Sequence, residues 1–139
     1  MERVLLDTDM YSELLRAKNS RLVAKGTQYR QNLGRFTVSS VTVVEMVRGF
    51  QRAGRNDQIA NLLTSIHAEQ VLSLNEDAAV MAGKIYGELE RTGQTIGRAD
   101  PMIAGIALHH DLTLATGNTQ HFERIIRLGF PLRLENWRT

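Results

Sequence analysis

The chain opens with Arg3-Val4-Leu5-Leu6-Asp7-Thr8-Asp9, and this stretch decides the fold. An apolar run of this length, bounded by polar residues and closing on an acid, is typical of a short buried strand. Asp9 is a candidate N-cap for a helix that begins at Met10 and repeats apolar residues at helical spacing. The opening residues therefore predict a strand, a turn and a helix, in that order.

The same strand and helix pattern continues along the chain. Further strands are predicted at 36–39, 71–74 and 112–116, with a short fifth strand at 132–134. Helices are predicted at 41–50 with Ser40 as N-cap, 56–69, 76–91 and 101–110, and 16–35 is predicted to be a polar, basic helical excursion. Parallel strands need crossover connections, which carry helices. The sequence thus predicts an α/β protein of three layers, α/β/α, with a parallel sheet of four to five strands.

Length and composition narrow the class of protein. The chain has 139 residues, of which 42% are hydrophobic and 23% charged, and it has no linker or repeat, so residues 1–139 are expected to form one domain. No cysteine is present, which excludes disulfides, thiolate metal sites and a cysteine nucleophile. The absence of a signal peptide and of a membrane-spanning apolar run predicts a cytoplasmic protein without membrane contact. Arginine makes up 14 of the 17 basic residues, as expected for a phosphate-bearing partner or for ordinary solvated helix faces.

Three carboxylates stand where a parallel sheet has its active site, beyond the carboxyl ends of the strands. Asp7 ends the first strand, where it can line a site or serve the turn. Glu45 lies among apolar residues, and a buried carboxylate needs a cationic partner, either Arg48 or a metal ion. Asp100 precedes Pro101, as a simple N-cap would, yet it shares the apolar stripe of its helix and is expected to point inward.

Such carboxylates from separate strand and helix units would repel one another without a cation. Oxygen ligands of this kind are preferred by Mg²⁺ and Mn²⁺. We therefore hypothesise a metal site formed by Asp7, Glu45 and Asp100, with open positions for phosphate oxygens and a water molecule. This arrangement is typical of nucleases.

Four segments, in this order and spacing, carry a family resemblance. They are Leu5-Leu6-Asp7-Thr8-Asp9, Ser39-Ser40-Val41-Thr42-Val43-Val44-Glu45-Met46, Ile96-Gly97-Arg98-Ala99-Asp100-Pro101-Met102-Ile103-Ala104-Gly105, and Ala115-Thr116-Gly117-Asn118 through Phe122-Glu123-Arg124-Ile125. The closing Leu134-Glu135-Asn136-Trp137 is also similar. Together they resemble the PIN-domain nucleases, and within them the VapC-type toxins of bacterial toxin-antitoxin pairs.

The resemblance implies a set of site residues. Asp7, Glu45 and Asp100 would bind Mg²⁺, for which Mn²⁺ can substitute, and Asn118 would lie near the same site. Many PIN domains have a fourth acid in the loop that contains Asn118, but residues 116–122 here contain no carboxylate, so we expect one metal ion rather than two.

Two further positions near these acids have an expected role. Arg98, two residues before Asp100, is the candidate for binding substrate. Asp9 stands where the family often has Asn, and it can contribute a carboxylate or only cap the first helix. The four histidines are not expected to form a site, because His67 and His121 lie far apart in the sequence and the other two end a helix.

The resemblance also implies an activity and partners. It implies an endoribonuclease that hydrolyses RNA, tRNA in particular, through a metal-activated water and leaves 5′-phosphate and 3′-hydroxyl ends. The expected partners are a VapB-type antitoxin and a second copy of the chain in a homodimer. One alternative is a catalytically weak PIN scaffold that acts through antitoxin and operator-DNA binding. Another is a haloacid dehalogenase-type phosphatase using Asp7 and Asp9, although Tyr11 stands where that family has Thr or Val.

Overall fold

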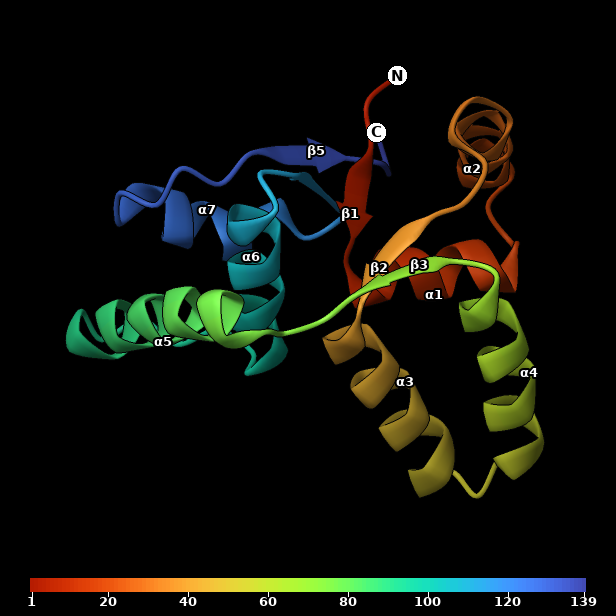
Figure 1. Cartoon of the computed structure of the whole chain (residues 1–139), viewed down its shortest axis with the longest axis horizontal. Coiled ribbons are helices and arrows are strands. Elements are labelled where there is room, and N and C mark those ends of the chain that lie inside the picture. Colours follow the sequence, from red (N-terminus) through yellow and green to blue (C-terminus); the bar gives the residue numbers. More distant parts are fainter.

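A computed structural model describes all 139 residues, and its centre is a five-stranded parallel sheet of order β3-β2-β1-β4-β5 (Figure 1). The strands are β1 (Val4–Leu6), β2 (Thr37–Ser39), β3 (Gln70–Leu72), β4 (Thr113–Thr116) and β5 (Leu134–Asn136). The predicted parallel α/β sheet is confirmed, with β5 beginning two residues later than expected. Because all strands run in one direction, their carboxyl ends meet at one edge.

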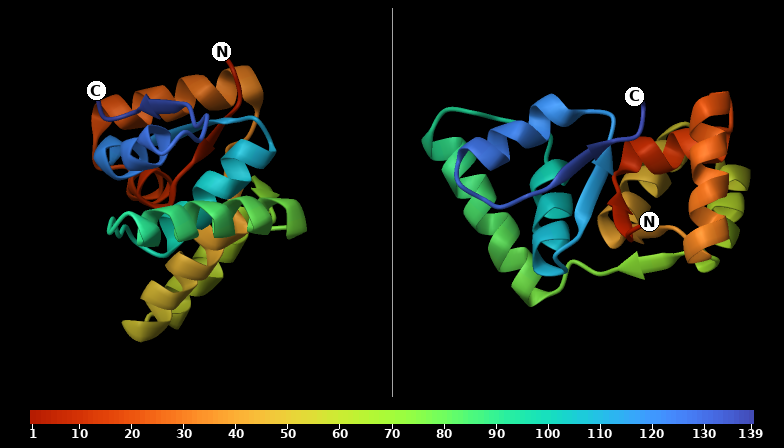
Figure 2. Two further views of the ribbon diagram at one scale, coloured as in Figure 1. Left: turned by 90° about the vertical axis from the view of Figure 1, so that its left-hand side faces the viewer. Right: turned by 90° about the horizontal axis from the view of Figure 1, so that it is seen from above.

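Seven helices connect and cover the strands. They are α1 (Thr8–Arg16), α2 (Ser20–Leu33), α3 (Ser40–Arg52), α4 (Asn56–His67), α5 (Glu76–Arg91), α6 (Ala99–His109) and α7 (Thr119–Arg127). Figure 2 shows α5, α6 and α7 on one side of the sheet and α1, α2 and α4 on the other. The three-layer prediction is confirmed, but α7 was not predicted. None of these helices is both long and apolar enough to span a bilayer.

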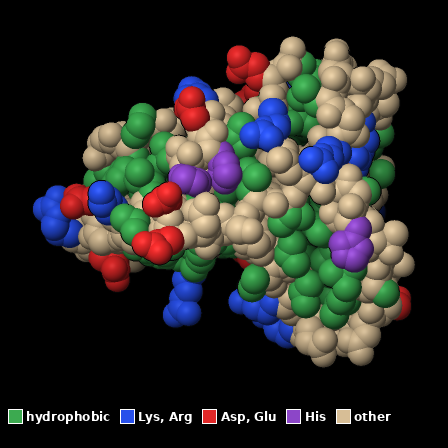
Figure 3. All heavy atoms as spheres, viewed as in Figure 1, with side chains coloured by type: hydrophobic (Ala, Val, Ile, Leu, Met, Phe, Trp, Pro, Cys, Tyr) green, Lys and Arg blue, Asp and Glu red, His purple; other side chains and the backbone are tan.

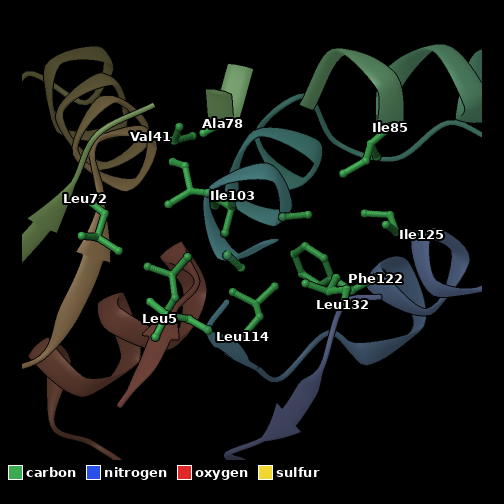
Figure 4. Packing of buried hydrophobic residues seen from close by; sticks show 14 of the residues in the cluster. Leu5, Val41, Leu72, Ala78, Ile85, Ile103, Leu114, Phe122, Ile125 and Leu132 are labelled. Carbon is green, nitrogen blue, oxygen red and sulfur yellow. The ribbon is translucent and has the colours of Figure 1, made fainter. Parts of the chain in front are cut away.

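Alternation along the strands divides the core between the two faces. Leu5 and Leu114 pack with Ile103 of α6 and Phe122 of α7 on one face (Figure 4). Their neighbours Leu6 and Ala115 belong to a second cluster on the opposite face, which contains residues of α1, α2 and α4. Successive strand residues point to opposite faces, so each central strand contributes to both cores.

Close packing between α5 and α6 places the beginning of α6. A Cβ atom at Gly105 would lie 2.7 Å from the Ala78 carbonyl oxygen and 3.0 Å from the Ala82 Cβ. Only glycine allows the two helices to approach so closely at this point. The contact fixes α6 against α5, and with it the first turn of α6 at the edge of the sheet.

On the other face, a buried acid ties three elements together. Glu69, 6% exposed, accepts hydrogen bonds from the Tyr11 hydroxyl at 3.1 Å, from the Phe36 backbone N–H at 3.1 Å and from the Arg30 guanidinium at 2.8 and 3.0 Å. This network satisfies a carboxylate that would be costly to bury alone. Trp137 is 5% exposed and belongs to the same apolar cluster, so the C-terminus packs against the core on this face of the sheet.

Candidate active site

Three strands deliver polar side chains to one edge of the sheet. β1 ends at Leu6 and is followed by Asp7, β2 ends at Ser39, and β4 ends at Thr116. Leu6 is paired in parallel register with Ala115, so Asp7 and Thr116 follow at the same level. The polar residues therefore gather where a parallel sheet places its functional site.

Asp7 is the most deeply buried acid of this group, with 5% of its surface exposed. Its Oδ1 accepts a hydrogen bond from the Met10 backbone N–H at 2.8 Å, and its Oδ2 accepts one from the Thr116 hydroxyl at 2.5 Å. Burial is the main cause that raises the pKa of the Asp7 carboxyl; these two hydrogen bonds lower it, the nearby charges of Asp9 and Asp100 raise it, and the net pKa is about 6. Asp7 is thus both the N-cap of α1 and a member of the site.

The predicted cap at Asp9 is therefore wrong. An N-cap residue needs extended backbone, which Asp7 adopts with φ −75° and ψ 173°, whereas Asp9 is already inside the first turn and is exposed. The predicted N-cap at Ser40 is also wrong. The Ser39 hydroxyl accepts a hydrogen bond from the Thr42 N–H at 3.1 Å, and Ser39 therefore caps α3. In both helices the last residue before the first turn makes the cap.

Asp100 lies in the first turn of α6 and does not cap it. The helix begins at Ala99, because proline is tolerated in a first turn, and this places Asp100 inside the helix. The half-buried Asp100 Oδ2 lies 3.3 Å from His121 Nδ1. Burial raises the pKa of Asp100, the contact with His121 opposes this, and the charges of Glu45 and Asp9 raise it again.

Glu45, on α3, is held by hydroxyl groups rather than by a cation. Its Oε1 accepts a short hydrogen bond from the Thr8 hydroxyl, which lies 2.9 Å from the Thr42 hydroxyl. The carboxylate is only half-buried, and its side-chain partner is the Thr8 hydroxyl rather than Arg48. The Arg48 alternative is therefore wrong, and the partial exposure of Glu45 explains why no protein cation is needed.

Asn118 and His121 link the end of β4 to Asp100. The Asn118 backbone N–H donates to the Thr116 hydroxyl at 2.9 Å, and its side-chain amide lies 2.9 Å from His121 Nδ1. Asn118 is thus near the site, as expected, whereas His121 was missed. The signal that could have found it is helical spacing, since His121 stands three residues after Asn118 at the start of α7.

The donor set suits a hard divalent cation. Asp100 acts electrostatically on Asp7, and Glu45 and Asp9 act on Asp100, so these carboxylates share one region of unfavourable negative charge. As the side chains stand, no three acidic or histidine groups lie close enough together to hold one ion. Binding of Mg²⁺ or Mn²⁺, which prefer oxygen ligands, would relieve the repulsion between these carboxylates.

A cavity of about 540 Å³ adjoins these carboxylates. Glu45 and Asp100 form part of its wall, together with Arg48 and Arg98. The remaining wall is mainly apolar, from residues such as Val44. Arg98 therefore lies beside Glu45 and Asp100, as its position two residues before Asp100 predicts, and it is exposed.

Comparison with known proteins agrees with this arrangement. The family model described as the PIN domain matches residues 4–128. The chain is 30% identical over 138 residues to the tRNA(fMet)-specific endonuclease VapC of Shigella flexneri and to ribonuclease VapC2 of Haemophilus influenzae, covering 99% of each chain in both cases. Its structure is similar to DNA-bound VapBC from Salmonella typhimurium, with a TM-score of 0.80, 28% identity and 99% coverage of both chains.

These matches argue against the phosphatase alternative, since they extend over nearly the whole chain and both curated relatives are named as nucleases. They also agree with the resemblance drawn from the four sequence segments. The chain belongs to the PIN-domain family, among its VapC-type ribonucleases.

Proposed function

We propose that this chain is a Mg²⁺-dependent endoribonuclease and the toxin of a VapBC-type toxin-antitoxin pair, with Mn²⁺ able to substitute for Mg²⁺. The observation that carries the proposal is the gathering of Asp7, Glu45 and Asp100 at one sheet edge, where Asp7 follows β1, Glu45 lies on α3 and Asp100 on α6. RNA is the proposed substrate, and the name of the Shigella flexneri relative favours tRNA.

Neighbouring residues fix the position of each carboxylate by hydrogen bonds or close polar contacts. Thr116 and the Met10 N–H hold both oxygens of Asp7, and Thr8 holds one oxygen of Glu45. His121 contacts one oxygen of Asp100. Each acid keeps at least one oxygen lone pair free for a cation, because a carboxylate accepts up to about four bonds.

Asp7, Glu45 and Asp100 are the proposed Mg²⁺ ligands. The ion would supply a bound water of lowered pKa and neutralise charge on the reacting phosphate. Water, not the 2′-hydroxyl, would attack in line, which leaves 5′-phosphate and 3′-hydroxyl ends. Arg98, at the wall of the adjoining cavity, would bind a phosphate of the substrate.

A VapB-type antitoxin is the proposed partner, and the chain is proposed to form a homodimer. The titles of several similar structures describe VapBC complexes. A cavity of about 700 Å³ between α1, α3 and α4 has an apolar part that includes Leu15, Met46 and Phe50 and a basic, polar rim that includes Arg16 and Arg55, and it could receive a partner segment. Figure 3 shows hydrophobic side chains gathered over α3 and α4. Co-expression with the antitoxin, followed by light scattering of the complex and of the free chain, tests both assemblies.

One observation favours a second candidate function, a scaffold of low activity that acts through the antitoxin and operator DNA. Residues 116–122 contribute no carboxylate to the site, and the similar Salmonella typhimurium complex is DNA-bound. Calorimetry of Mn²⁺ binding separates the two functions. A scaffold without a metal site would give the same titration for the wild-type chain and for Asp7→Asn.

The ribonuclease proposal is tested on total RNA. The wild-type chain, Asp7→Ala and the matched control Asp57→Ala, an exposed acid on α4, are incubated with Mg²⁺ and the RNA ends are mapped. We expect 5′-phosphate and 3′-hydroxyl ends with the wild type and Asp57→Ala, and no cleavage with Asp7→Ala or with EDTA. Finding 2′,3′-cyclic phosphate ends, or the same RNA profile for the wild type and Asp7→Ala, would contradict the proposal.

A further inference from the structure

Arg138, the penultimate residue, lies beside the candidate active site. It follows β5, whose last residue Asn136 pairs with Thr116 at the end of β4. The Trp137 N–H donates to the Thr116 carbonyl oxygen at 3.4 Å, and the Arg138 N–H donates to Asn136 Oδ1 at 2.9 Å. The end of the chain is therefore fixed at the sheet edge that carries Asp7.

The Arg138 side chain covers the loop that follows β4. Three of its guanidinium atoms (Cζ, Nε and Nη1) lie equally close to the point where a Cβ atom at Gly117 would stand. The flat face of the guanidinium therefore covers Gly117, and any other residue there would displace it. Gly117 directly follows Thr116, whose hydroxyl donates to Asp7. This close approach places a permanent positive charge next to the buried acid.

One side of the guanidinium is held and the other is free. Nε donates to Glu13 Oε2 at 3.3 Å, and Nη2 forms a short ion pair with Glu13 Oε1. Nη1 of Arg138 makes no hydrogen bond within the protein. A guanidinium fixed by a carboxylate on one edge loses less conformational freedom when its remaining N–H groups bind an anion.

Acidic side chains surround Arg138, and they favour a cation at this position. The hydrogen bond to Glu13, and then the charges of Glu13, Asp9 and Asp7, raise the pKa of Arg138, so the guanidinium is within electrostatic reach of these acids. An RNA strand approaching Asp7, Asp9 and Asp100 would meet negative charge. A cation at the same edge offsets that repulsion and attracts the phosphate backbone.

We propose that Arg138 binds a phosphate of the RNA next to the carboxylates through its free Nη1 edge, and that Glu13 orients it. This inference rests on the proposed ribonuclease function. It adds a phosphate-binding residue from the C-terminus, on the side of the site formed by β4 and β5, whereas Arg98 lies beside the cavity at the start of α6.

Binding of a short fluorescein-labelled single-stranded RNA, measured by fluorescence anisotropy in EDTA over a series of salt concentrations, tests the inference. We expect Arg138→Ala to weaken binding about tenfold at low salt, as for one charged hydrogen bond, and to lower the slope of log affinity against log salt by about 1. Arg138→Lys keeps the charge and should keep the slope. Arg133→Ala is the matched control, because Arg133 also pairs with an acid, Asp111, but at the opposite edge of the sheet.

Urea unfolding of each variant separates binding from a structural role. If Arg138 only ties the C-terminus to α1, Arg138→Ala will lower stability and leave the salt slope unchanged, which overturns the inference. If the wild type cleaves RNA with Mg²⁺ but Arg138→Ala binds with unchanged affinity and slope, this inference alone fails. If the wild type neither binds nor cleaves RNA, the proposed function fails with it.

Discussion

Replacing Asp7 by Asn should make the metal-free protein more stable at neutral and alkaline pH. The pKa of Asp7 is about 6 in the folded chain and 3.8 as the reference value for an unburied acid. The folded state therefore binds the Asp7 proton more tightly than the unfolded state does. The stability linked to this group is complete below about pH 3.8 and is lost as the pH rises through 6.

The size of the effect follows from the two pKa values. A difference of about 2 units corresponds to a cost of about 3 kcal/mol for keeping Asp7 ionised in the folded chain at pH 8. Asn avoids this cost, keeps the acceptor for the Met10 N–H, and loses the acceptor for the Thr116 hydroxyl, which costs about 1 kcal/mol. Asp7→Asn should thus gain about 2 kcal/mol at pH 8.

Near pH 4.5 the ionisation cost falls to about 1 kcal/mol and the two effects cancel. Urea unfolding of both proteins in EDTA, at about pH 4.5 and at pH 8, measures the difference directly, because other titrating groups are common to the two chains. The matched control is Asp57→Asn, whose exposed side chain should give no pH-dependent difference. A destabilised Asp7→Asn at pH 8, or a difference that does not change with pH, would refute the reasoning.

Three further predictions concern the hydrogen bonds of the buried Glu69, the contact between α5 and α6 at Gly105, and metal binding. Glu69→Ala should cost about 3 kcal/mol in urea unfolding, because the Phe36 N–H and the Tyr11 hydroxyl lose their buried acceptor; an unchanged midpoint would contradict this. Gly105→Ala should cost about 1–3 kcal/mol in the same assay through the clash between α5 and α6, and a stabilised variant would show that the helices separate freely. Mn²⁺ in excess should raise the melting temperature of the wild type but not of Asp100→Asn, and equal shifts would remove Asp100 from the ligand set.

Most of the fold could be predicted because its signals are local. The apolar run that forms β1 and the helical spacing of apolar residues in α5 are both visible in residues close in sequence. The predicted ends of α5, 76–91, are the observed ones. α7 was missed because its nine residues carry few apolar positions, Phe122 and Ile125 being the buried ones. These apolar residues, with Ile126, do recur at helical spacing, so the helix could have been recognised from periodicity despite its short length.

The sequence predicted that Asp7, Glu45 and Asp100 lie near one edge of the sheet, but not which groups form hydrogen bonds with them. Acids at strand ends can be recognised from sequence position, because the topology of a parallel sheet brings strand ends together. His121 and Arg138 enter the site through tertiary contacts with Asp100 and Glu13, from segments 21 and 125 residues away. His121 could have been found only by first recognising α7 and then its helical spacing from Asn118, and nothing in the local sequence distinguishes Arg138 from an ordinary surface residue.

The burial of Asp7 lowers the stability of the metal-free chain at neutral pH, and the surroundings of this carboxyl suggest why it is nevertheless kept. Burial of this carboxyl opposes its ionisation, while Thr116 and the Met10 N–H support the ionised form, and the balance leaves its pKa at about 6. An acid kept only to cap α1 could do so at the surface, where ionisation costs nothing. Under the proposed function, Asp7 is a cation ligand that is unfavourable when metal-free, and we expect the stability lost in the metal-free chain to return when a cation binds.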